Sequence, residues 1–223
     1  MVNASSERHA DNRFAVIVDI SQSRTHADRR ALQTQIEAAF THVNEIVPPD
    51  QPLQPTVGDE FQAAYDGLGT ALHATLLARL SLPEGVDCRF GLGFGEVAAI
   101  GTGVTGVLQD GSAWWAARKA IDEARKHQYS KLAFVRTWFR AAEPSPAEAL
   151  VNAYLLGRDQ IVSAMNPRAR RLLLGQSLGE TQGALAQQEG ITQSAVSQNL
   201  ARSGANAVIA GEALVLEAAG VFG

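Results

Sequence analysis

The sequence has little that would place the protein outside the cell or in a membrane. Its one cysteine, Cys88, excludes an internal disulfide and favours a reducing compartment. No apolar run approaches the ~20 residues needed to span a bilayer. The polar stretch from Asn3 to Arg13 lacks the apolar segment of a signal peptide. We therefore expect a cytoplasmic protein with no membrane partner.

An excess of basic residues is also missing. The formal net charge is −4, so any nucleic-acid surface must come from the local placement of charges. Apolar residues make up 46% of the chain and charged residues 19%, which is typical of a soluble globular protein with a core. The length of 223 residues exceeds that of a typical single domain, so two modest domains are expected.

The first half has a pattern of strands alternating with helices. Residues 14–18 form a continuous branched apolar run, which predicts a strand buried on both faces and ending at Asp19. The other elements expected from periodicity and breakers are a helix at 25–47, a hairpin around 56–65, a helix at 67–80, a strand at 88–97, a loop or hairpin at 101–111, a helix at 112–126 and a strand at 132–139. This order predicts an α+β domain at residues 12–142 with a β-α-β-β-α-β, ferredoxin-like core.

Two features of this half bear on packing. Large residues alternate with glycine over 88–97, which indicates a strand closely approached by another backbone or by a ligand. Trp114 and Trp115 are adjacent, and tryptophans are more often found in a core or an interface than against a ligand. Arg118, one turn after Trp114, is either a phosphate contact or an ordinary exposed helix arginine.

The second half lacks a convincing strand. The segment Glu143-Pro144-Ser145-Pro146 is the predicted boundary, followed by an all-α domain at residues 147–223. Its expected helices cover 147–165, 167–174, 180–189, 193–202 and 205–219, with a turn at 175–179. No internal repeat or low-complexity tract is present.

Residues 185–197 have the layout of a helix-turn-helix. Ala186 is small enough for two helices to cross closely, and Gly190 tolerates the positive φ of the turn. Ile191, Val196 and Leu200 would pack the second helix onto the core. The side chains expected to face outward, toward base edges and phosphates, are Thr192, Gln193, Ser194, Ser197, Gln198 and Arg202. An ordinary helical hairpin in a bundle is the alternative.

The charge of this segment is weak. Residues 166–204 contain four arginines and two glutamates, and Glu189 takes a position that is usually apolar in helix-turn-helix units. Arg168, Arg170 and Arg171 nevertheless cluster at the start of one helix, where they could contact the phosphate backbone of DNA. A homodimer on a palindromic site would double such contacts.

A metal and phosphate site is predicted in the first half. If their strands are neighbours, Asp19 and Asp59 offer two hard oxygen ligands suited to Mg²⁺ or Mn²⁺. Ser21, Ser23 and Arg24, in the loop entering a helix, could receive phosphates at its N-terminus. A Gly-Asp turn and a helix-capping aspartate are the alternative interpretations. No His or Cys spacing suggests zinc.

Several short segments of the chain form a recognisable set: Val18–Arg24, Asp28-Arg29, Leu32-Gln33, Asn44, Gly-Asp-Glu-Phe-Gln at 58–62, Arg89–Gly93, Asp110–Ala113 and Ala117-Arg118. With this set the chain resembles the bacterial SatD family, and Gly-Asp-Glu-Phe-Gln is the most specific element of the match. More distantly, the first half is similar to the palm domain of class III nucleotide cyclases and GGDEF proteins. In those families two aspartates, matched here by Asp19 and Asp59, hold the metals that bind a nucleotide triphosphate.

The resemblance implies a purine nucleotide or cyclic nucleotide as ligand. The candidate nucleotide-binding residues are Ser21, Gln22, Ser23, Arg24, Gly58, Glu60, Gln62 and Arg118. Cyclases also carry an asparagine that serves the transition state, and Trp114 stands in its place here. Loss of such a donor typically costs ~10²- to 10³-fold in rate, so no catalytic residue is assigned. We expect a DNA-binding transcriptional regulator that senses a nucleotide; the alternative is a nucleotide cyclase or hydrolase with a helical appendage.

Overall fold

The protein has a mixed α/β fold, described by a computed structural model over residues 11–21, 29–56, 59–103, 106–127 and 129–218. The strands are β1 (Asp11–Ser21), β2 (Gln51–Pro55), β3 (Glu60–Tyr65), β4 (Asp87–Gly103), β5 (Gly106–Asp110) and β6 (Thr137–Ala141). The helices are α1 (Arg29–Ile46), α2 (Leu68–Leu80), α3 (Ser112–His127), α4 (Pro146–Ala164), α5 (Pro167–Ser177), α6 (Gln182–Glu189), α7 (Gln193–Arg202) and α8 (Ala205–Glu217). No helix within these ranges is long and apolar enough to cross a membrane.

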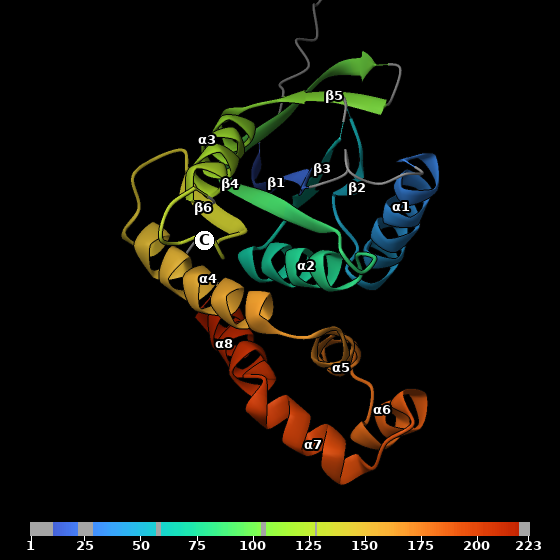
Figure 1. Ribbon diagram of the computed structural model, residues 1–223. Helices are drawn as coiled ribbons and strands as arrows, with labels where there is room; N and C mark the ends of the chain where they lie inside the picture. The colour runs from blue at the N-terminus through green and yellow to red at the C-terminus, as the bar shows by residue number, and fades with distance from the viewer. Residues whose placement is uncertain (1–10, 22–28, 57–58, 104–105, 128, 219–223) are drawn as a thin grey trace, which may run out of the picture.

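The strands form one six-stranded sheet in the order β2-β3-β1-β4-β5, with β6 paired to β4. Only the β4–β6 pair is parallel among the pairs of this sheet; the others are antiparallel. Helix α3 lies on one side of the sheet, and α1 and α2 lie on the other (Figure 1). The chain order β1-α1-β2-β3-α2-β4 is the order expected from the sequence.

Strand β1 is buried on both faces, as its apolar run predicts. Val16 and Val18 pack into the core shared with α1 and α2, whereas Ala15 and Ile17 pack against α3. The strand does not end at Asp19 as expected. It continues to Ser21, because β4 supplies pairing partners along its whole length.

The glycines of β4 allow α3 to lie directly on the sheet. A Cβ on Gly93 would come within 2.1 Å of the Ala113 carbonyl oxygen, and one on Gly91 within 2.3 Å of the Ala117 carbonyl oxygen. Real side chains do not tolerate such distances, so only glycine fits at these positions. The alternation in the sequence therefore marks the approach of a helix backbone.

Three further expected boundaries were wrong. β4 continues to Gly103 rather than ending at 97, because its second part pairs with β5. β6 starts at Thr137 rather than 132, because the preceding residues form a turn in which the Val135 amide donates to the Leu132 carbonyl. Helix α5 continues to Ser177 through the turn expected at 175–179. Gly175 stays helical since it packs against Leu185, whose Cδ2 would lie 2.3 Å from an added Cβ.

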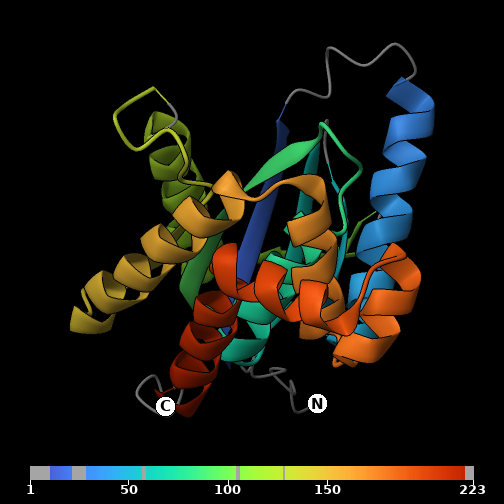
Figure 2. The same cartoon turned by 60° about the horizontal axis from the view of Figure 1, so that its bottom comes forward.

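Helix α2 is common to the packing of both halves of the chain. Its Leu72 joins the sheet core, whereas Leu76 and Leu80 join a second cluster built by the C-terminal helices. Figures 1 and 2 show α2 between the sheet and the helices α5 and α8. Ala71, Ala74, Leu77 and Ala78 of α2 also pack into the sheet core, so α2 is buried almost all round.

A buried carboxylate fastens α4 to the sheet. Asp159 is fully buried, and its Oδ2 accepts hydrogen bonds from the amides of Arg136 at 2.7 Å and Thr137 at 2.6 Å. Its Oδ1 lies 3.3 Å from Nη1 of Arg79 on α2. The neighbouring Arg158 donates to the Thr137 hydroxyl at 2.7 Å. Helices α2 and α4 and strand β6 thus meet at one charged group that has hydrogen-bond partners on both oxygens.

The variant Asp159→Ala should lower the free energy of unfolding by about 3–5 kcal/mol, because it leaves buried donors without their acceptor. Urea denaturation at neutral pH measures this change. The matched control is Asp122→Ala, which removes a half-exposed partner 3.8 Å from Arg125 and should cost less than about 1 kcal/mol. Equal losses for the two variants would contradict a structural role for the buried carboxylate.

Candidate functional site

Charged side chains gather where β1, β3 and β4 run side by side beneath α3. Asp19 is the register partner of Glu60 on β3 and of Arg89 on β4. Its Oδ2 accepts hydrogen bonds from Arg89 Nη1 at 2.5 Å and from Arg125 Nη2, on α3, at 3.1 Å. The Asp19 carboxylate is therefore held between two guanidinium groups.

Glu60 forms the second ion pair of this cluster. Both its oxygens accept from Arg118 on α3, at 2.6 and 2.7 Å, and Gln62 adds a hydrogen bond of 3.0 Å. Partial burial would raise the pKa of Glu60, but these bonds and the charges of Arg118 and Arg125 lower it below its usual value. Its carboxylate in turn raises the pKa of Arg118. Of the candidate nucleotide-binding residues, the structure thus brings Glu60, Gln62 and Arg118 together.

Sequence reasoning did not assign Arg89 or Arg125 to this site. Arg125 is seven residues after Arg118, which places both on one side of α3 and is a signal that could have found it. Arg89 faces the same side of the sheet as Gly91 and Gly93, since alternate residues of a strand share a face. With Arg118 they make three guanidinium groups. These match in number the three carboxylates of the site, at Asp19, Asp59 and Glu60.

The hairpin tip lies beside the end of β1, as the sequence predicts. The Ile20 amide donates to the Asp59 carbonyl at 3.4 Å, so Asp59, the turn residue directly before β3, lies beside the end of β1. Ser21 pairs through its backbone with Asp87. The remaining candidates, Gln22, Ser23, Arg24 and Gly58, lie outside the described residues.

The donor chemistry of this site suits a metal ion bound together with a phosphate. Two carboxylates at adjacent strand ends are the kind of oxygen ligand with which Mg²⁺ combines waters and phosphate oxygens. Over the described ranges, however, no group of three His, Cys, Asp or Glu side chains could hold a metal ion. Asp19 is instead bound by arginines.

The two adjacent tryptophans have opposite environments. Trp114 is 9% exposed and packs against Ala15 and Ile17, so its indole belongs to the core. Trp115 is 64% exposed, which excludes the core location considered for it from the sequence. No polar donor at position 114 is therefore presented to the charged cluster.

In the second half, α6 and α7 are joined by a tight turn with the packing that the sequence predicts. Gly190 ends α6 with φ at 64°, a conformation that glycine adopts at little cost. Ala186, Val196 and Leu200 are buried in the helical cluster, and Ile191 packs partly against it. The side chains on the outer side of this pair, all exposed, are Thr192, Gln193, Ser194, Ser197, Gln198 and Arg202.

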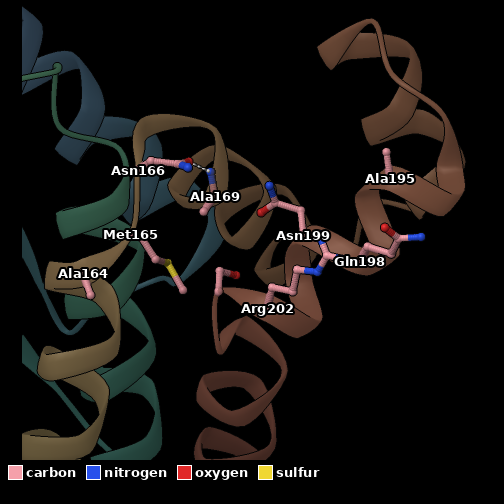
Figure 3. Close-up of a pocket in the computed structure, with 9 residues that line it drawn as sticks. Ala164, Met165, Asn166, Ala169, Ala195, Gln198, Asn199 and Arg202 are labelled. Carbon is pink, nitrogen blue, oxygen red and sulfur yellow. Dashed lines mark hydrogen bonds between the residues drawn. The ribbon is translucent and has the colours of Figure 1, made fainter.

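A cleft of about 510 Å³ runs between α7 and the junction of α4 with α5. Figure 3 shows Gln198, Asn199 and Arg202 on one side of it and Met165 and Asn166 on the other. Asn166 is occupied as the cap of α5, where it accepts from the Ala169 amide at 2.9 Å. The side of the cleft formed by α7 therefore carries amides and a guanidinium but no acid.

The three arginines at the start of α5 do not act as one group. Arg168 and Arg171 both bind Glu189 at the end of α6, with distances of 3.3 and 2.6 Å. Arg170 turns the other way and donates to the Arg79 carbonyl at 2.9 Å. Thus two of the expected phosphate contacts are half-exposed and ion-paired, and the third is directed into the protein.

A family model and two solved structures are similar to parts of this chain. Residues 13–212 match the SatD family. The chain belongs to this family. Two solved structures of a bacterial light-regulated adenylyl cyclase are similar at 16% and 14% identity, each with a TM-score of 0.45. The match covers 56% of this SatD-family chain and 43% of those chains. Among curated proteins there is no match.

The lowered pKa of Glu60 predicts a pH-dependent contribution to stability. The ionised carboxylate stabilises the fold above its usual pKa of 4.5, and this contribution is lost as pH falls through the lowered value. Arg118→Ala should cost at most about 1 kcal/mol at neutral pH, because the pair is partly exposed, and less as Glu60 becomes protonated. Urea unfolding across this pH range measures the difference between the two proteins.

The control for this pH series is Lys126→Ala, since Lys126 pairs with Glu123 one turn away on the same helix. The free energy of unfolding of this variant, plotted against pH, should run parallel to that of the wild type. A constant difference between wild type and Arg118→Ala from neutral to acidic pH would show that Glu60 is not stabilised by Arg118.

Proposed function

We propose that this SatD-family protein is a DNA-binding regulator whose first half binds a nucleotide as a sensory ligand. The observation that carries the proposal is helix α7. Its inner side is fixed by Val196 and Leu200, while its outer side displays short hydrogen-bonding groups and Arg202, with no acidic residue along the helix. A helix with these properties can enter the major groove and reach base edges.

In this proposal α6 and α7 form a helix-turn-helix and α7 is the recognition helix. The cap of α7 is Thr192, whose hydroxyl accepts from the Ala195 amide at 3.1 Å, so the first turn is preformed. Gln193, Ser194 and Ser197 lie near this end, which usually contacts the bases. Gln198 and Arg202 follow toward the cleft of Figure 3, where a backbone phosphate would find a guanidinium and an amide.

The sparse positive charge of this face favours a homodimer. Arg168 and Arg171 share Glu189, so their pull on a phosphate is reduced by a carboxylate already bound to them. Non-specific affinity grows with the number of phosphates that are neutralised. Two copies on a palindromic site would double both the phosphate and the base contacts.

The charged cluster under α3 is proposed to bind the nucleotide, on a palm-like arrangement of the sheet. Arg89, Arg118 and Arg125 now hold carboxylates, and a phosphate chain could take their place as the partner of the guanidinium groups. Asp19 and Asp59 would hold the accompanying Mg²⁺ or Mn²⁺, which neutralises phosphate charge. The ligand class is a purine nucleotide or a cyclic nucleotide.

An enzymatic role is less well supported by the same residues. Catalysis requires polar groups aimed at the charge that develops in the transition state. Trp114 directs an indole into the core where cyclases place an asparagine. A nucleotide cyclase or hydrolase remains the alternative, and Arg118 with its neighbours is the feature that favours it.

The DNA-binding proposal predicts that wild-type protein binds at least one labelled genomic fragment at low salt in fluorescence anisotropy. Arg202→Ala should weaken binding on all fragments and lower the salt slope by about 1, as expected for one lost phosphate contact. Lys126→Ala removes an exposed charge at the far end of α3 and serves as the control with unchanged binding. Absence of binding by the wild type to every fragment would refute the proposal.

The nucleotide proposal predicts that ATP, GTP or a cyclic purine nucleotide, with Mg²⁺, raises the melting temperature. A ligand at 100 times its dissociation constant stabilises by about 2.7 kcal/mol. Arg118→Ala should abolish the shift, whereas Arg140→Ala, which breaks an ion pair with Glu148 elsewhere on the surface, should retain it. Turnover of ATP or GTP in these samples, lost in Asp59→Ala, would instead establish the enzymatic alternative.

A further inference from the structure

Trp115 is an exposed aromatic residue with no structural task in the part of the chain that is described. The residue is 64% exposed. The preceding residue, Trp114, already supplies the indole that packs on the sheet. The ring and cation–π contacts found among the described residues do not include Trp115. Its backbone amide donates to the Gly111 carbonyl, as in any first helical turn. The side chain is therefore available to a ligand.

The position of Trp115 relates it to the charged cluster. Residues three and seven apart on a helix share one side, so Trp115, Arg118, Asp122 and Arg125 line the same side of α3. Arg118 binds Glu60 on β3 and Arg125 binds Asp19 on β1, so this side of the helix is the one that borders the candidate site. Trp115 and Arg125 are ten residues apart, which corresponds to about 15 Å along the helix axis.

We propose that Trp115 is the base-stacking platform of the nucleotide site, and this inference rests on the nucleotide binding proposed above. The phosphates would lie toward Arg118 and Arg125, and the sugar would bridge the intervening turn of α3. The base would stack on the indole of Trp115. An aromatic ring beside guanidinium groups is the combination by which proteins hold bases and phosphates together.

The proposed arrangement predicts selectivity for nucleotides over polyphosphates, but little selectivity among bases. Stacking accepts every base, since each has a π-face, so Trp115 would separate nucleotides from plain polyphosphates but would discriminate little between adenine and guanine. The arginines supply the complementary part, because they attract any phosphate chain whether or not it carries a base. Base binding and phosphate binding are thus carried by different residues and can be separated by substitution.

The test is isothermal titration of the full chain with ATP, GTP and inorganic tripolyphosphate, each with Mg²⁺. Trp115→Ala should weaken binding of both nucleotides by about 5- to 150-fold while leaving the tripolyphosphate affinity unchanged. Trp115→Phe should keep most of the nucleotide affinity. Tyr129→Ala is the matched control, because Tyr129 is an 84% exposed aromatic residue beyond the end of α3 and should have no effect.

A second readout is the intrinsic fluorescence of the protein. Nucleotide binding should quench it in the wild type and in Tyr129→Ala, and Trp115→Phe should lose most of this quenching although it still binds. Equal nucleotide affinities for Trp115→Ala and the wild type would overturn the stacking assignment alone. A wild type that binds tripolyphosphate but neither nucleotide would overturn it as well. A wild type that binds none of the three would refute the proposed nucleotide site itself.

Discussion

The buried carboxylate of Asp159 is the contact on which the relation between the two halves of the chain depends. A charge in a protein interior is tolerated only when its hydrogen-bonding capacity is met, and here two backbone amides and a guanidinium meet it. Those partners come from the start of β6, from Arg136 directly before it and from α2, whereas Asp159 comes from α4. The C-terminal helices are therefore fixed to the sheet by a geometry that a looser apolar contact would not specify.

The same network reaches the candidate nucleotide site. Arg79 binds Asp159 on one side and Asp87 on the other, at 3.3 and 3.0 Å. Asp87 begins β4, and two residues later Arg89 holds Asp19. A ligand that took Arg89 away from Asp19 would act on a strand end anchored to α2 and α4. Such a connection becomes allosteric only if the ligand prefers one of two arrangements of these residues.

Local patterns in the sequence identified the elements but not the long-range ion pairs. The apolar run of β1, the caps and turn of α7 and the glycines of β4 each act through near neighbours, so they are readable from spacing. Arg89 and Arg125 bind Asp19 across 70 and 106 residues; helix spacing puts Arg125 on the same side of α3 as Arg118 but does not identify its partner. The extension of α5 through Gly175 was equally hidden, because it depends on Leu185 in another helix.

Glu189 shows how an apparent departure from a motif becomes part of the structure. An acid at the end of α6 would weaken a DNA-binding unit if its charge were unopposed. Here Arg171 and Arg168 bind it and, by their hydrogen bonds and charge, lower its pKa, so its carboxylate links the start of α5 to the end of α6. As a consequence, Arg168 and Arg171 are held in place by Glu189, and its single negative charge offsets part of their positive charge. In the proposed complex with DNA, these two arginines would therefore contribute less than Arg202 and the hydrogen-bonding side chains of α7.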